Sequence, residues 1–281
     1  MNKKIVFLGA GSMAEALIAG IRAHNDHKTD IWVTNRSNDL QLSHLKERYS
    51  VIPCRDMAIL LKDADVVLIA VKPKDVLAVL ELANPFLSDQ TLLISVAAGI
   101  STDTLESITK KPMPIIRAMP NTSAAVGKSA TALSGNRYVQ LKDRSLAERI
   151  FNTVGMSVYT TEEKMNAVTG LSGSGPAYIY YLIEAMEQSA KQIGLEATEA
   201  KSLIIQTLLG AAEMVKASSK SPETLRMDVT SPGGTTEAGV RILENNQVKR
   251  TFIDCIQEAT NQSERMGKEL AQKIDQELLK R

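Results

Sequence analysis

A glycine-rich segment near the start of the chain has the residue types that bind a dinucleotide. The segment GAGSMA places Gly9, Gly11 and Ala14 in a G-x-G-x-x-A arrangement between an apolar run and a helix-like segment. Gly9 permits a tight turn, Gly11 lets a pyrophosphate approach the backbone, and the small Ala14 lets helix and strand pack closely. Free N–H groups at the start of the helix would then face the phosphates. The predicted contacts are Leu8, Gly9, Ala10, Gly11, Ser12 and Met13.

The second expected strand ends in residues that bear on the choice of cofactor. An NAD site usually offers Asp or Glu to the ribose hydroxyls at this point, whereas the segment IWVTNRSND offers Asn35, Arg36 and Ser37. A carboxylate would repel a 2′-phosphate, but a guanidinium and two neutral donors would bind it through charge-assisted hydrogen bonds. These residues favour NADP. NAD stays an alternative, since Arg36 could be only a solvated loop residue.

A second motif interrupts the helical C-terminal third of the chain. It reads SPGGTTEAG and begins at Ser231. Gly233 and Gly234 expose backbone immediately before a helix, and Thr235 and Thr236 bring hydroxyl groups to its first turn. Bare N–H groups and two hydroxyls at a helix N-terminus suit a carboxylate ligand. The alternative is structural, a glycine turn followed by a threonine cap.

Two later strands are expected to end beside the same cofactor, because ligands of such sheets lie beyond the carboxyl ends of the strands. The run VVLIAV ends at Val71 and is followed by Lys72 and Pro73. The run TLLISVA is followed by Ala98 and Gly99. We predict that these five residues contact the cofactor; a proline-terminated strand and an ordinary turn are the alternatives.

These motifs need a scaffold, and the pattern along the chain predicts one in two parts. Within residues 1–161, continuous apolar runs alternate with helix-length segments, which is typical of a Rossmann-like, doubly wound parallel sheet. The runs are 5–8, 31–34, 66–71, 91–97 and 114–119. In residues 162–281 the strand signal stops, and we predict an all-helical domain for substrate binding and dimerisation. Its expected helices are 177–193, 199–218 and a stretch from 236 onward.

The middle helix of that second domain is apolar around nearly its whole circumference. Its apolar residues are Leu203, Ile204, Ile205, Leu208, Leu209, Met214 and Val215. Such a helix must be buried on nearly all sides, and a helical domain of this size has little room to bury it. We therefore predict a homodimer through the C-terminal helices, with a higher oligomer of dimers as a further option.

The composition narrows the class of partner. The chain has 33 Lys and Arg against 32 Asp and Glu, so its net charge of +1 offers no broad attraction for nucleic acid or anionic lipid. Cys54 and Cys255 lie far apart without metal-ligand spacing, which indicates a reducing compartment, no metal and two small buried side chains. The N-terminal apolar run breaks at Gly9, too soon for a signal peptide or a membrane span. We expect a soluble cytoplasmic protein that binds neither nucleic acid nor membranes.

Four motifs in order along the chain resemble the Δ1-pyrroline-5-carboxylate reductase family, which makes L-proline. They are GAGSMA, AVKP at 70–73, GLSGSGPAY at 170–178 and DVTSPGGTTEAG at 228–239. The resemblance implies a Rossmann domain, a helical domain that interlocks with a second subunit, and active sites that use both chains. It also implies that the SPGGTT loop closes over the carboxylate and ring nitrogen of the substrate, with Thr236 as the active-site threonine. Glu162 falls where the family places a substrate-pocket carboxylate, so the implied substrate-binding set is Glu162, Ser231, Gly233, Gly234, Thr235 and Thr236.

The implied reaction is the NAD(P)H-dependent reduction of 1-pyrroline-5-carboxylate to L-proline, the last step of proline biosynthesis. Hydride is added to the carbon of a protonated C=N group and the nitrogen keeps its proton, so no residue need supply one. The histidines agree with this: His24, His27 and His44 all lie in polar segments of the first domain that we expect at the surface.

Two other functions are compatible with parts of this sequence. A reductase of the β-hydroxyacid dehydrogenase kind, or another imine reductase, would share the two-domain plan. The β-hydroxyacid enzymes carry a lysine on the helix after their second glycine-rich motif, and the segment from Pro176 to Met186 has neither Lys nor His. A nucleotide-binding sensor or scaffold without activity would explain GAGSMA but not the Gly-Gly-Thr-Thr run.

Overall fold

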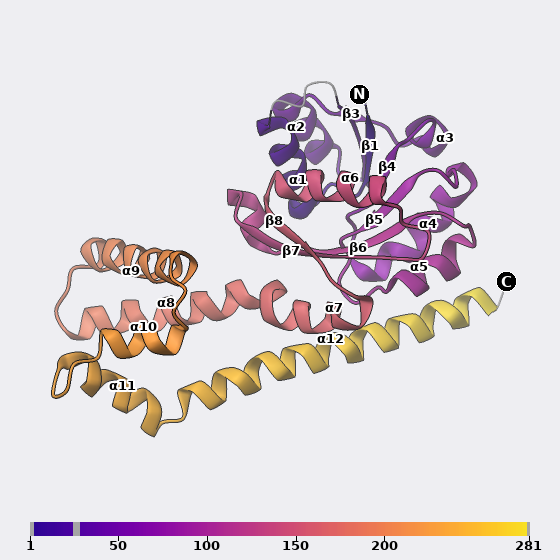
Figure 1. The fold of residues 1–281 in the computed structure, drawn as a ribbon. Coiled ribbons are helices and arrows are strands. Elements are labelled where there is room, and N and C mark those ends of the chain that lie inside the picture. The colour runs from indigo at the N-terminus through magenta and orange to yellow at the C-terminus, as the bar shows by residue number, and fades with distance from the viewer. Residues whose placement is uncertain (1–2, 25–28, 280–281) are drawn as a thin grey trace. The chain divides into compact units, whose positions relative to one another are not determined.

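The computed structural model describes residues 3–24 and 29–279 of the 281-residue chain; His27 therefore lies outside the described residues. The chain packs as two compact units (Figure 1). Residues 1–174 and 258–281 form the first, which we name the sheet unit, and residues 175–257 form the helical unit. This division differs from the expected boundary at residue 161, because the segment after it and the end of helix α12 (Val248–Leu279) pack with the sheet. The proposal that residues 1–161 and 162–281 are separate functional domains stays a prediction.

One eight-stranded sheet, in the order β3-β2-β1-β4-β5-β6-β7-β8, organises the described part of the sheet unit. Its strands are β1 (Lys4–Leu8), β2 (Asp30–Thr34), β3 (Ile52–Pro53), β4 (Val66–Ile69), β5 (Leu92–Ser95), β6 (Ile115–Met119), β7 (Ser129–Gly135) and β8 (Gly155–Tyr159). The strand order reverses beside β1, and the carboxyl ends of strands at such a point are where doubly wound sheets bind ligands. The expected doubly wound fold and all five expected strands are confirmed.

The sheet departs from the expected parallel pattern at one place, where β6 and β7 pair antiparallel. The connection between them holds only the short 3-10 helix η3 (Thr122–Val126). A parallel crossover needs a dozen or more residues, so the short connection forces the reversal. The three strands that we did not expect, β3, β7 and β8, lack a continuous apolar run.

Alternate residues of the inner strands face two separate cores. On β1, Ile5 and Phe7 face one core while Val6 and Leu8 face the other, and all four are buried. The first core is covered by α1 (Ser12–Ala23), α2 (Asp39–Tyr49) and α6 (Leu141–Asn152). The second is covered by α3 (Met57–Leu61), α4 (Val76–Ala83), α5 (Thr102–Thr109) and the end of α12.

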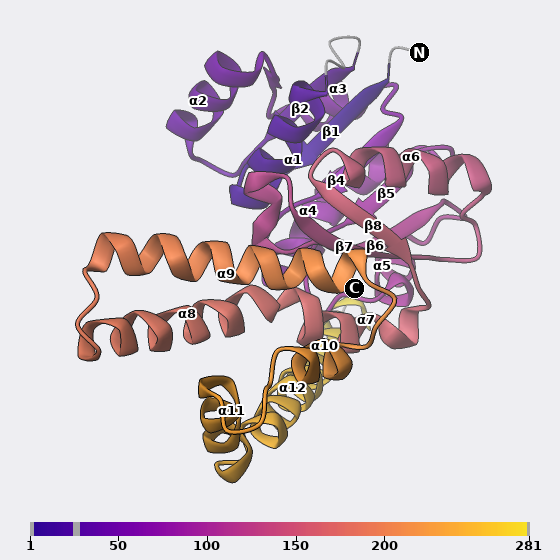
Figure 2. The ribbon, with the colours of Figure 1, turned by 60° about the vertical axis from the view of Figure 1, so that its left-hand side comes forward.

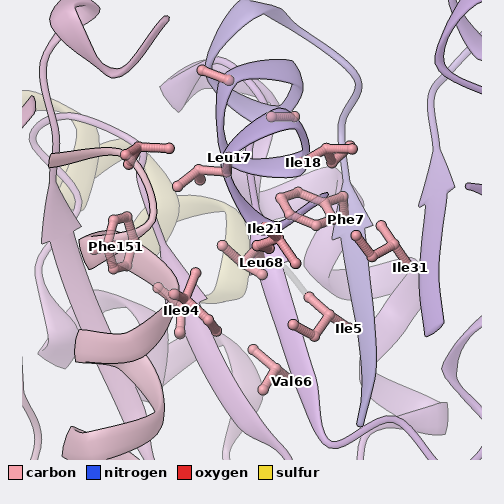
Figure 3. Close-up of a cluster of buried hydrophobic side chains, with 14 of the residues drawn as sticks. Ile5, Phe7, Leu17, Ile18, Ile21, Ile31, Val66, Leu68, Ile94 and Phe151 are labelled. Carbon is pink, nitrogen blue, oxygen red and sulfur yellow. The ribbon is translucent and has the colours of Figure 1, made fainter. Parts of the chain in front are cut away.

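Figure 3 shows the first of these cores, in which side chains of α1 lie over those of the strands. Leu17, Ile18 and Ile21 are at most 3% exposed, so this helix is fixed on the sheet by burial of its apolar face. Because the glycine turn leads directly into α1, the same packing fixes the position of that turn.

The helical unit contains α8 (Gly175–Gln192), α9 (Ala197–Ala217), α10 (Pro222–Asp228), α11 (Thr235–Asn245) and the start of α12. Helices α8 and α9 pack side by side (Figure 2). Their shared core has only three buried residues, Ala190, Ala200 and Ile204. The helical stretch expected from 236 onward is divided, because Gln247 adopts a left-handed φ of 54° between α11 and α12.

Two further sequence expectations can be compared with these units. Across residues 3–24 and 29–279, no helix combines the length and apolar character that a membrane crossing would need. Cys54 is half-buried and Cys255 is exposed in the single chain, so neither cysteine is buried as expected.

Candidate active site

The turn between β1 and α1 has one position that only glycine can occupy and one that leaves space open. Gly9 has a φ of +115°, and a Cβ there would lie 2.4 Å from the carbonyl oxygen of Ala70. Gly11 is the N-cap of α1, no side chain caps this helix, and nothing lies within 4 Å of where its Cβ would be. The start of α1 therefore presents N–H groups beside open space, an arrangement that suits a phosphate.

Two more of the predicted loops lie at the same edge of the sheet, because β1, β4 and β5 are adjacent and parallel. After β4, Val71 and the exposed Lys72 lead into the 3-10 turn η1 (Pro73–Asp75). After β5, Ala98 is followed by Gly99, which has a φ of +76°. The structure thus brings these residues and the glycine turn to one edge, while β4 ends two residues before the expected position.

Two guanidinium groups lie at the loop after β2, where we predicted one, because Arg55 reaches Asn35 from the end of β3. Asn35 is half-buried, and Arg36 and Ser37 are exposed; within the described residues Arg36 makes no hydrogen bond or ion pair. Arg55, which follows β3, donates from Nε to the carbonyl oxygen of Asn35 at 3.3 Å and pairs with Asp39 at 2.6 Å. Sequence reasoning missed Arg55 because β3 has only two residues and no apolar run that would mark it as a strand.

Glu162 belongs to a polar network inside the sheet unit. It lies in the 3-10 turn η4 (Glu162–Lys164), and its Oε1 accepts a hydrogen bond from Nη1 of Arg117 at 2.7 Å. Arg117 is only 3% exposed and also donates to Oδ1 of Asn166, which accepts from Ser263 of α12 at 3.0 Å. The other oxygen of Glu162, Oε2, is buried and has no hydrogen-bond partner in the described chain. A buried carboxylate oxygen without a donor is an acceptor available to a ligand.

Arg117 is the second functional candidate that sequence reasoning missed. It lies in the middle of β6, where the flanking apolar residues predict only a buried strand. A buried guanidinium needs a counterion, so a charged residue within such a run was a signal. Its partner Glu162 is 45 residues away along the chain, however, and no spacing rule connects the two.

A cavity of about 200 Å³ lies within the sheet unit and is partly lined by two predicted residues. Its lining consists of Ala98, Gly99, Thr169, Ser174, Ala259, Gln262, Ser263 and Met266. The short helix α7 (Met165–Val168) leads into its wall, a π-helical turn (Thr169–Gly173) of the kind often found at functional sites. Asn121, after β6, holds this turn by donating to the carbonyl oxygen of Ser172 at 3.0 Å.

The SPGGTT loop begins α11 in the helical unit. Gly233 has a φ of +73°, and Gly234 is the N-cap of α11 without any side-chain cap. Thr235 and Thr236 are therefore the first helical residues and not caps, and their exposed hydroxyls make no hydrogen bond to the described residues. The N–H of Gly233 donates to the carboxylate of Glu237 at 2.7 Å. An N–H group of this turn thus already binds one carboxylate, and two hydroxyls beside it are exposed.

The two described histidines, His24 and His44, make no hydrogen bond or ion pair to Glu162, the predicted substrate residue of the sheet unit. Both are exposed: His24 is the C-cap of α1, and His44 lies on α2 and contacts Glu15 at 3.1 Å. No cluster of three or more His, Cys, Asp or Glu side chains in the described residues could hold a metal ion.

Comparison with known proteins covers both parts of the chain. A family model described as pyrroline-5-carboxylate reductase dimerisation matches residues 162–266. Another, described as NADP oxidoreductase coenzyme F420-dependent, matches residues 4–99. The first model thus includes Glu162 and the SPGGTT loop, and the second includes the glycine turn.

Individual relatives match nearly the whole chain. Pyrroline-5-carboxylate reductase 2 of Bacillus subtilis (strain 168) is 44% identical over 96% of this chain and 97% of its own length. The structure of a pyrroline-5-carboxylate reductase from Coxiella burnetii has a TM-score of 0.87 and 38% identity, covering 96% of this chain and 99% of that one. The Plasmodium falciparum enzyme, solved with NADP bound, has a TM-score of 0.85 and 31% identity, covering 95% and 98%. The chain belongs to the pyrroline-5-carboxylate reductase family.

Proposed function

We propose that this protein reduces 1-pyrroline-5-carboxylate to L-proline, using NADPH or NADH as the hydride donor. The observation that carries the proposal is the 44% identity to the Bacillus subtilis reductase over 96% of the chain. Identity at that level spans both units, so the cofactor motif and the substrate motif are matched together. A sensor or scaffold would leave the SPGGTT motif unexplained, and a β-hydroxyacid reductase would need a lysine that the segment from Pro176 to Met186 lacks.

The cofactor is assigned to the carboxyl edge of the sheet. The uncapped start of α1 and the open space at Gly11 suit the pyrophosphate, and the exposed Arg36 suits a 2′-phosphate. The bound NADP of the Plasmodium falciparum relative supports NADP(H) as the main cofactor, with NAD(H) as an alternative. The nicotinamide supplies the hydride, and the residues of this chain bind and orient it.

The substrate carboxylate is assigned to residues 231–236. The exposed hydroxyls of Thr235 and Thr236 and the N–H groups of the first turn of α11 can donate to it, as Gly233 already does to Glu237. Thr236 is assigned to the ring nitrogen as well, and the free Oε2 of Glu162 is an acceptor for an N–H group. The chemistry requires this loop and the nicotinamide to meet in the assembled enzyme.

The reaction as written needs no acid from the protein. The substrate enters as a protonated imine, two electrons arrive with the hydride at carbon, and the nitrogen retains its proton. The protein therefore contributes mainly alignment, which is worth about 7 to 11 kcal/mol for a well-oriented pair of reactants. One hydroxyl contributes about 0.5 to 1.5 kcal/mol, so alignment is the larger effect.

The active form is proposed to be a homodimer built on the helical unit. Leu203, Leu209 and Met214 of α9 are 53%, 56% and 58% exposed in the single chain. A helix with so many exposed apolar residues is stable only when a second surface covers it. The match to a dimerisation family model over residues 162–266 supports a second copy as that surface.

The decisive test is the oxidation of NADPH on addition of 1-pyrroline-5-carboxylate, followed by absorbance, with L-proline identified as the product. NADH in place of NADPH measures the cofactor preference, and a β-hydroxyacid with NADP tests the rival chemistry. Formation of NADPH from NADP and the hydroxyacid, without oxidation of NADPH by the imine, would overturn the proposal. The absence of any turnover, together with nucleotide binding, would favour the sensor alternative.

A further inference from the structure

Arg55 joins the loops that follow β2 and β3. These strands are parallel neighbours, and the N–H of Cys54 donates to the carbonyl oxygen of Val33 at 3.0 Å. From this position Arg55 reaches back to Asn35, with Nε 3.3 Å from the carbonyl oxygen and Nη2 3.1 Å from Oδ1. The guanidinium is therefore held beside the residues that we assigned to the 2′-phosphate, although it is distant from them in sequence.

A ligand can displace Asp39, the ionic partner of Arg55. Nη2 of Arg55 lies 2.6 Å from Oδ1 of Asp39, the first residue of α2. The two side chains are 43% and 78% exposed, so water competes for both charges and the pair is weak. A phosphate carries more charge than a carboxylate and offers three oxygens, which makes it the stronger partner for a guanidinium.

Asp39 also affects the charge of this edge. Arg36, which has no partner within the described residues, and Arg55 supply two positive charges, and Asp39 cancels one of them. A phosphate bound to Arg55 must displace Asp39 and then lie near a carboxylate of like charge. An adenosine with a free 2′-hydroxyl meets no such repulsion and can donate a hydrogen bond to that carboxylate.

We propose that Arg55 binds the 2′-phosphate of NADP together with Arg36, and that Asp39 limits the preference for NADP over NAD by competing for Arg55. This inference rests on the proposed cofactor site and adds a specificity-determining pair to it. Removing Arg55 should lower the preference, and removing the charge of Asp39 should raise it. A purely structural role for Arg55 would not separate the two kinds of ligand.

The test measures equilibrium binding to the purified full-length protein by calorimetry, with adenosine 2′,5′-bisphosphate and adenosine 5′-monophosphate as probes. Arg55→Gln should weaken binding of the bisphosphate roughly tenfold or more, since a charge-assisted contact is lost, and should leave the monophosphate nearly unchanged. Asp39→Asn should strengthen binding of the bisphosphate about threefold to tenfold. Lys46→Gln is the matched control, an exposed cation in the last turn of α2 whose loss should change neither.

Three outcomes decide the matter. The two opposite shifts, confined to the bisphosphate, would support the proposal. Equal losses for both probes in Arg55→Gln would overturn it and assign Arg55 to holding the loop, and thermal melts of each variant would exclude unfolding as the cause. A wild-type protein that binds neither probe would overturn the cofactor site itself, and this inference with it.

Discussion

The sheet unit and the helical unit use the same residue types at a helix start, but with different support from the chain. At Gly9 the neighbouring backbone leaves no room for a Cβ, whereas nothing lies within 4 Å of a Cβ added at Gly233. The sheet unit also buries its apolar residues in two large cores, while the core of the helical unit has three buried residues. The sheet unit is thus complete within one chain, and the helical unit needs a second surface.

The largest effect is expected on dimerisation, from a change in the exposed apolar residues of α9. Leu209→Glu should abolish the stable dimer, because two copies each lose about 1.5 to 3 kcal/mol of apolar burial and place a charge in the interface. Sedimentation equilibrium measures the change. Leu141→Glu is the control, since Leu141 is 81% exposed on α6 of the sheet unit. Equal dissociation of both variants would mean that α9 does not form the interface.

The next effect tests the buried polar network of the sheet unit. Arg117→Met should lower the free energy of unfolding by about 3 to 5 kcal/mol, because it leaves the charge of Glu162 without its counterion. Denaturant unfolding measures this loss. Arg117→Met with Glu162→Gln should cost less than the sum of the two single changes. Additive losses would show that the two side chains are not coupled.

A smaller effect on stability is expected in the turn between β1 and α1, where Gly9 and Gly11 should respond differently to substitution. Gly9→Ala should destabilise the sheet unit by about 2 to 3 kcal/mol, since its Cβ would meet the carbonyl oxygen of Ala70 at 2.4 Å in a left-handed conformation. Gly11→Ala should change the stability by less than about 1 kcal/mol and yet weaken NADPH binding. Unfolding curves and cofactor titrations distinguish the two. Unaltered NADPH binding in Gly11→Ala would remove this turn from the pyrophosphate site.

The smallest effect concerns the exposed loop of the helical unit. Thr236→Val should lower kcat/KM roughly fivefold, which corresponds to a loss of about 1 kcal/mol of transition-state stabilisation. One hydroxyl is lost, while the alignment of the reactants persists. Its Tm should stay near that of the wild type, since this hydroxyl makes no hydrogen bond within the described residues. Thr230→Val, which removes a hydroxyl bonded to the carbonyl oxygen of Arg226, serves as the control and should alter the Tm instead. A kcat/KM equal to the wild-type value would exclude Thr236 as a substrate contact.

The sequence predicted those parts of the fold that depend on local pattern. Apolar runs such as IVFL and VVLIAV become buried parallel strands, and the helix expected over 177–193 is present as α8. What the sequence did not predict depends on distant contacts. Strand β3 has two residues and pairs only because β2 is beside it.

In the candidate site, too, the residues that depend on distant contacts were not predicted. Arg55 and Arg117 acquire their roles through Asn35 and Glu162, which are 20 and 45 residues away. The identities of these arginines were visible in the sequence, but their partners were not. The glycine turn, in contrast, could be predicted because strand, turn and helix follow one another directly.

Helix α12 has a consequence for biosynthesis. Ile274, near its end, covers the second face of the sheet, so the sheet unit is closed by residues that a ribosome adds after the whole helical unit. A nascent chain stalled before residue 258 would hold a finished strand order with one apolar face still partly uncovered. Closure of that face therefore waits until α12 has been synthesised, and chaperones that bind exposed apolar surface would have their target in that interval.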